Sequence, residues 1–152
     1  SGTLAGRGFG AAFGPAPLRV ASAVVDSEGR PNPGCAPFGP EVSFAGAIVV
    51  CQREGLERTA MAANAAAAGA GGVVLLNDSG SGANLNDDVY PLPAVQLGYG
   101  DGQALLAWAA GCGNCQARIA GTARLLDPAA ADILAAFSAR GPDGSVPDLL
   151  KP

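Results

Sequence analysis

Two short apolar runs on either side of an alanine-rich segment constrain the fold of this 152-residue chain most strongly. Residues 46–51 (GAIVVC) and 72–77 (GVVLLN) each begin at a glycine, and short apolar runs bounded in this way are typical of buried strands. Residues 57–68 (ERTAMAANAAAA) predict a helix, because alanine has the highest helix propensity. Glu57 suits the positive end of the helix dipole, and Gly69 is a natural C-cap. The region therefore predicts a strand, a helix and a second strand.

The remaining elements extend this unit to a mixed fold. Further elements are expected as strands at 18–25, 94–97 and 116–123, a second helix at 103–110, and one or two helical turns at 128–136. Asp101 is placed to cap the second helix, which Gly111 ends. Two helices cannot cover both faces of a large parallel sheet. We therefore expect an α/β (α+β) fold in which a barrel-like sheet carries two peripheral helices.

Charge and residue content exclude several classes of function. The formal net charge is −4 and no basic cluster exists, which disfavours binding to nucleic acids and to anionic membranes. No apolar run approaches the roughly 20 residues that a membrane-spanning helix needs. The chain contains no histidine, so no catalytic triad with an imidazole base can form within it. These residues alone are therefore not expected to be an enzyme.

Four cysteines, which allow three pairings, predict two disulfides and an oxidising compartment. Cys112 and Cys115 form a CxxC motif at the C-terminal end of the predicted second helix, where the helix dipole disfavours a thiolate. A redox role and a zinc site, which lacks histidine or a second CxxC, are therefore weaker interpretations than a disulfide. If this pair is bonded, Cys35 pairs with Cys51.

The loop after residue 77 offers oxygen ligands and a glycosylation sequon. Its oxygen-bearing side chains are Asp78, Asn84, Asn86, Asp87 and Asp88. Calcium is conceivable there, but the spacing fits no EF-hand, so we expect a solvated loop and no cofactor. Asn77 begins an Asn-Asp-Ser sequon, which we interpret as a chance occurrence.

The stiff apolar segment Tyr90-Pro91-Leu92-Pro93 has two interpretations. It could pack against the core, or it could present a contact surface, since prolines reduce the entropy lost on ordering. In the second interpretation Tyr90 and Leu92, together with Tyr99, are candidates for contact with a partner.

Residues 46–78 resemble the signature of the protease-associated (PA) domain, with a strand, a polar turn, an Ala-rich helix ending in Gly-Ala and a strand ending in Asn. YPLPAVQLGYGDGQALLAW resembles the proline-valine strand, acidic cap and Leu-rich helix of that family. FSARGP, at residues 137–142, resembles the point where a subtilisin-like serine peptidase resumes its catalytic domain. The resemblance implies an N-terminal linker (1–15), a PA domain (16–127) and a return segment into the host (128–152).

The resemblance also implies a function. A PA domain of a secreted subtilisin-like serine endopeptidase is expected to modulate substrate access, substrate binding or self-association without catalysing hydrolysis. Its expected partners are the host catalytic domain, peptide or protein substrates, and a second copy. Ser138, within FSARGP, does not match the family's nucleophile. The alternatives are a zinc aminopeptidase or receptor as host, and a small enzyme that binds an anion at its strand–Gly–helix turns.

Overall fold

The computed structural model describes residues 2–123 of the chain. The return segment 128–152, the helical turns expected at 128–136 and Ser138 lie outside the described residues. The elements, in chain order, are β1 (Phe13–Val20), a 3-10 helix η1 (Ala21–Ala23), β2 (Ile48–Gln52), α1 (Arg58–Ala67), β3 (Gly72–Leu76), β4 (Ala94–Leu97), α2 (Tyr99–Ala110) and β5 (Gln116–Ile119). None of the helices within residues 2–123 has the length and apolar character needed to cross a bilayer.

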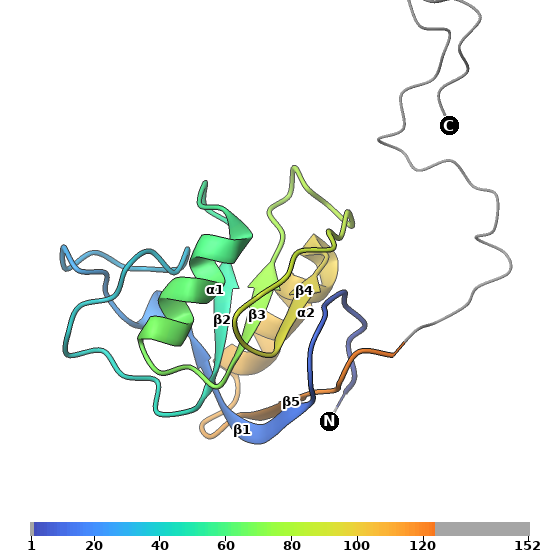
Figure 1. The fold of residues 1–152 in the computed structure, drawn as a ribbon, viewed down its shortest axis with the longest axis horizontal. Coiled ribbons are helices and arrows are strands. Elements are labelled where there is room, and N and C mark those ends of the chain that lie inside the picture. The colour runs from blue at the N-terminus through green and yellow to red at the C-terminus, as the bar shows by residue number, and fades with distance from the viewer. Residues whose placement is uncertain (1, 124–152) are drawn as a thin grey trace, which may run out of the picture. The chain divides into compact units, whose positions relative to one another are not determined.

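The five strands form one curled mixed sheet in the order β4-β3-β2-β1-β5. Strands β1 to β4 are parallel, whereas β5 pairs with β1 in the antiparallel direction. Figure 1 shows the sheet with α1 on one face and α2 behind the other. The predicted fold class, a curled sheet with two helices, is confirmed.

The central strand β2 supplies side chains to both faces of the sheet. Val49 and Cys51 belong to the core cluster that includes buried residues of α1, and Ile48 and Val50 belong to a second cluster against which α2 packs. This alternation follows from the two-residue period of a strand. A parallel strand covered on both faces reads as a continuous apolar run, as the sequence of β2 does.

The predicted boundaries of α1 and β3 hold to within one or two residues. Gly69 has a φ of +83°, and the N–H of Ala70 donates to the carbonyl of Ala65 at 3.0 Å, so the expected C-cap is confirmed. The second helix is different, because α2 begins at Tyr99 with Gly98 as its N-cap. Asp101 lies inside the first turn and is not the cap, although the dipole still favours it there.

The first strand begins earlier than expected, at Phe13 and not at residue 18. Its first half pairs with β5, with a register shift between Phe13 and Ala16. The glycine and prolines of this stretch suggest a break in structure when only local sequence is considered. The pairing partner lies about a hundred residues later, which is why the sequence did not reveal this part of the strand.

Candidate interaction surface

A buried polar cluster lies where the loop 78–93 leaves β3 and rejoins β4. It consists of Asn77 directly after β3, Gln96 within β4 and Arg58 at the start of α1, which are 4%, 0% and 8% exposed. Asn77 Oδ1 accepts hydrogen bonds from Gln96 Nε2 at 2.6 Å and from Arg58 Nη2 at 3.3 Å. Buried polar groups are tolerated when they are paired in this way.

This polar cluster holds the loop in place. Asn77 Nδ2 donates to the carbonyls of Gly82 at 3.1 Å and Asn84 at 2.6 Å. Gln96 Oε1 accepts from the N–H of Asn86 at 2.8 Å. The backbone of a loop without regular structure is therefore bonded to side chains fixed in the core. Sequence reasoning missed Arg58 and Gln96, although a glutamine in the apolar run AVQL was a usable signal.

The glycosylation sequon begins at Asn77, whose side chain is buried and hydrogen-bonded within the fold. Asn77 is 4% exposed, and its side-chain nitrogen, the atom that would carry a glycan, is engaged in two hydrogen bonds. A glycan on this nitrogen is incompatible with the folded domain. The geometry agrees with the interpretation of the sequon as a chance occurrence.

The acidic residues of the loop are dispersed. Asp78 faces Arg53 at 3.5 Å, Asp87 forms an ion pair with Arg7 at 2.9 Å, and Asp88 accepts from the hydroxyl of Tyr90 at 3.3 Å. Among the described residues, no three acidic or cysteine side chains are grouped as a metal site requires.

The carboxylate of Asp78 organises the start of the loop. The N–H of Ser81 donates to Asp78 Oδ1 at 2.6 Å, and the hydrogen bonds from Ser81 lower the pKa of Asp78 below its usual value. The charged carboxylate thus closes the turn at residues 78–81, and Arg53 supports it from the end of β2.

The three candidate contact residues lie in two different environments. Tyr90 is 8% exposed and belongs to the α1-side core cluster, against which Leu92 also packs. Both side chains pack on the core, as in the core-packing interpretation of the Tyr-Pro-Leu-Pro segment. Tyr99, at the start of α2, is 40% exposed and remains available to a partner.

We expect one phenol of this chain to ionise only at about pH 12. Burial raises the pKa of Tyr90 to about 12, and the neighbouring carboxylate of Asp88 adds to this effect. The folded state thus holds this proton more tightly than the unfolded chain. The Tyr90 phenol therefore leaves the free energy of unfolding unchanged below about pH 10 and lowers it as the pH rises from about 10 towards 12.

Ultraviolet absorbance of the phenolate, followed against pH, measures this ionisation. The chain has two tyrosines, so Tyr99→Phe should keep the late transition and Tyr90→Phe should remove it. The prediction is wrong if Tyr90 ionises near pH 10 while circular dichroism shows that the domain is still folded.

The two ends of the described domain are fastened together. The N–H of Gly10 donates to Thr122 Oγ1 at 2.9 Å, Thr122 Oγ1 donates to the carbonyl of Gly8 at 3.0 Å, and the N–H of Thr122 donates to the carbonyl of Gly10 at 3.1 Å. We call this arrangement the junction clamp. Residues 8–10, which lie in the stretch expected to be a linker, are hydrogen-bonded to Thr122.

The N-terminal segment also covers the β4 edge of the sheet. The backbones of Arg7 and Gln96 exchange two hydrogen bonds, of 2.9 and 2.7 Å. A Cβ at Gly8 would overlap the carbonyl oxygen of Ala94, so the close approach requires glycine. Through this bridge and the junction clamp, residues 7–10 connect β4 to the end of β5 and complete the curl of the sheet.

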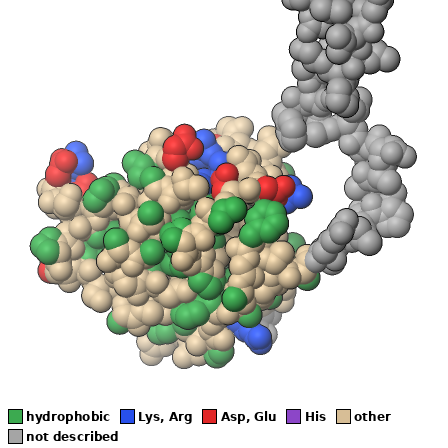
Figure 2. Space-filling view, in the orientation of Figure 1, with side chains coloured by type: hydrophobic (Ala, Val, Ile, Leu, Met, Phe, Trp, Pro, Cys, Tyr) green, Lys and Arg blue, Asp and Glu red, His purple; other side chains and the backbone are tan. Residues whose placement is uncertain are grey.

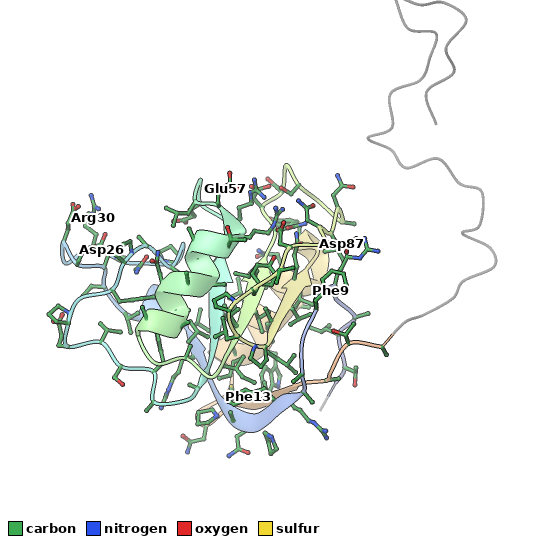
Figure 3. The ribbon with its side chains drawn as sticks, in the orientation of Figure 1. Phe9, Phe13, Asp26, Arg30, Glu57 and Asp87 are labelled. Carbon is green, nitrogen blue, oxygen red and sulfur yellow. A yellow bond between two sulfur atoms is a disulfide. The ribbon has the colours of Figure 1, made fainter. Side chains whose placement is uncertain are left out.

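Exposed apolar side chains accompany this segment. Leu4 is 40%, Phe9 46% and Val89 78% exposed, and the ion pair between Arg7 and Asp87 joins the N-terminal segment to the loop that carries Val89. Figure 3 places Phe9 close to Asp87, and Figure 2 shows apolar and charged side chains side by side in this region. We refer to Leu4, Phe9 and Val89 as the junction surface.

Two disulfides join Cys35 to Cys51 and Cys112 to Cys115. This is the pairing expected from the sequence. Cys35 and Cys51 are fully buried in the α1-side cluster, whereas Cys112 and Cys115 are half-buried between α2 and β5. The first bond therefore belongs to the core and the second to the surface.

The amino-acid sequence of this chain is similar to a known domain family and to several known proteins. The PA domain family matches residues 18–105. The chain is 38% identical over 107 residues to the Arabidopsis thaliana protein "Subtilisin-like protease SBT5.4", 34% over 107 residues to "Subtilisin-like protease SBT1.6", and 32% over 108 residues to "Subtilisin-like protease SBT1.4". Each match covers 70% of this chain and only 14% of the relative.

Proposed function

Because the chain belongs to the PA domain family, we propose that it is a non-catalytic interaction and regulatory domain of a larger subtilisin-like serine endopeptidase. Its similarity to plant subtilisin-like proteases supports this host over a zinc aminopeptidase or a receptor. The chain has no histidine, so the imidazole of a Ser-His-Asp triad would come from outside these residues.

The junction clamp is the observation that carries the proposal. Several hydrogen bonds hold residues 8–10 beside Thr122, so the polypeptide enters and leaves the domain at one place. A domain whose ends lie together can be inserted into another domain with little disturbance of either. This arrangement suits an accessory domain placed within a host peptidase.

The junction surface gives the proposed domain a means of contact. Leu4 and Phe9 expose apolar area on the N-terminal segment, and Val89 does so on the loop that the ion pair between Arg7 and Asp87 joins to this segment. We assign these side chains to contact with the host catalytic domain. Such a contact would fix the domain over one side of the peptidase and limit which substrates reach its active site.

The two disulfides support a route through an oxidising compartment. Disulfides persist in secreted proteins and are rare where cytosolic thiols keep cysteines reduced. Together with the similarity to plant subtilisin-like proteases, they support a secreted host.

Activity measurements test the proposal in two steps. The purified chain should hydrolyse no peptide and should take no label from a fluorophosphonate that modifies reactive serines. In a peptidase that contains this domain, deleting residues 7–122 and joining the ends should preserve hydrolysis of short peptides and change cleavage of folded proteins. Serine-inhibitor-sensitive hydrolysis by the isolated chain would refute the proposal, and so would unchanged cleavage of both substrate classes by the folded deletion variant.

A further inference from the structure

The Cys112–Cys115 bond differs from the other disulfide in its exposure to solvent. Cys35 and Cys51 are 0% exposed, and the carbonyl of Cys35 accepts a hydrogen bond from Asn64 Nδ2 of α1 at 2.9 Å. A reductant can reach that bond only when the core opens. Cys112 and Cys115 are both half-buried, so solvent reaches their bond in the folded state.

The two sulfur atoms of the exposed bond are not equivalent. Cys115 packs against the α2-side core cluster, and its carbonyl accepts from the N–H of Leu18 in β1 at 2.8 Å. Cys112 does not belong to that cluster and follows the end of α2, where its N–H donates to the carbonyl of Ala109 at 3.3 Å. Because Cys115 makes the contacts with the core, we take Cys112 as the sulfur that an incoming thiol attacks.

From this contrast we infer that Cys112–Cys115 is a site of reversible thiol–disulfide exchange that opens while the domain stays folded. The thiolate of a small thiol or dithiol attacks Cys112 Sγ, the bond to Cys115 breaks, and Cys115 leaves as a thiolate that takes up a proton. A second thiol then displaces the mixed disulfide from Cys112. Two external thiols are oxidised to one disulfide, and the two cysteines are reduced.

The surrounding structure favours closing the bond again. The Cα atoms of the two cysteines lie 5.5 Å apart, and hydrogen bonds to Leu18 and Ala109 hold each residue at its own side of the short turn. This separation is within the normal range for a disulfide. The end of a helix carries a partial negative charge, which disfavours a stored thiolate at Cys112. The spacing of the two residues and the helix dipole therefore both favour the closed bond over a stored thiolate.

Opening the bond has a local effect. The disulfide ties the end of α2 to the start of β5, and the sheet otherwise holds this helix mainly through Gly102, Leu105, Leu106 and Ala109. Trp108 lies one helical turn before Cys112, is 42% exposed and is the single tryptophan of the chain. A disulfide in contact with an indole quenches its fluorescence, so we use the emission of Trp108, four residues before Cys112, as a second readout of the bond.

Alkylation of the folded chain tests the inference directly. The unaltered chain is treated with dithiothreitol in native buffer, and free thiols are trapped with iodoacetamide and located by mass spectrometry. Cys112 and Cys115 should be trapped at least about tenfold faster than Cys35 and Cys51, because only the second pair requires the core to open. Equal rates, or earlier trapping of Cys35 and Cys51, would overturn the inference.

Fluorescence of Trp108 provides an independent measurement. Emission should rise at the same reductant concentration that opens the bond and should return on reoxidation. In a chain with Cys112→Ser and Cys115→Ser, the reductant should not alter the emission of Trp108. If the emission of this variant rises as it does in the original chain, the assignment is wrong. If the variant does not fold, the alkylation rates of the unaltered chain still decide between the two outcomes.

Discussion

Replacing Asn77 with alanine is expected to lower the free energy of unfolding by about 1 to 3 kcal/mol, the range for leaving a buried hydrogen-bonding group without its partner. The change removes the oxygen that accepts from Gln96 and Arg58 and the nitrogen that donates to the carbonyls of Gly82 and Asn84. The buried guanidinium of Arg58 then loses a hydrogen-bond partner, and each unpaired buried group adds a desolvation cost.

Chemical denaturation followed by circular dichroism measures this loss. Asn84→Ala is the matched control, since Asn84 contributes only its backbone carbonyl to the cluster and its side chain is exposed. That variant should remain within about 0.5 kcal/mol of the original chain. If Asn77→Ala is as stable as Asn84→Ala, the polar cluster does not hold the loop in the way described.

The unit β2, α1 and β3 could be predicted from the sequence almost residue by residue. Its signals are local: β2 and β3 are short apolar runs buried on both faces, and α1 is an alanine-rich segment with a glycine in the left-handed conformation after it. Local propensity and tertiary burial agree in this unit. Where both levels favour the same structure, a sequence is a reliable guide.

The N-terminal part of the domain could not be predicted in this way. Phe13 pairs with Ile119, and Gly10 with Thr122, across more than a hundred residues of chain. Nothing in the segment 6–10 alone distinguishes a linker from an edge that packs on β4. Its glycines suggest flexibility, whereas in the structure Gly6 and Gly8 allow the backbone to approach β4 closely.

The candidate site was only partly visible for a related reason. Tyrosine and leucine suit both cores and contact surfaces, so the sequence left both interpretations open for Tyr90 and Leu92. The path of the loop 78–93, fixed by Asn77 and Gln96, decides that they enter the core. A buried arginine and a buried glutamine are rare enough that composition alone does not suggest such a cluster.

Replacing Cys35 and Cys51 together with alanine should have a comparable effect on stability. The bond closes a loop with a sequence separation of 16, for which the chain-entropy model gives a contribution of about 3 kcal/mol. Both sulfur atoms lie in the core, so the variant also loses packing against neighbours such as Phe44 and Met61. The loop between the two cysteines gains freedom in the unfolded chain, and the native state loses contacts.

The pair Cys112→Ala and Cys115→Ala is the matched control for this second prediction. It removes the same chemical bond, but the loop it opens has a sequence separation of 3 and lies at the surface. The entropic contribution of a disulfide is smaller for a shorter closed loop, so this variant should lose less stability than the Cys35 and Cys51 variant. Thermal unfolding of both variants decides the order. A reversed order would mean that the link between α2 and β5, and not the buried bond beside α1, limits the stability of the domain.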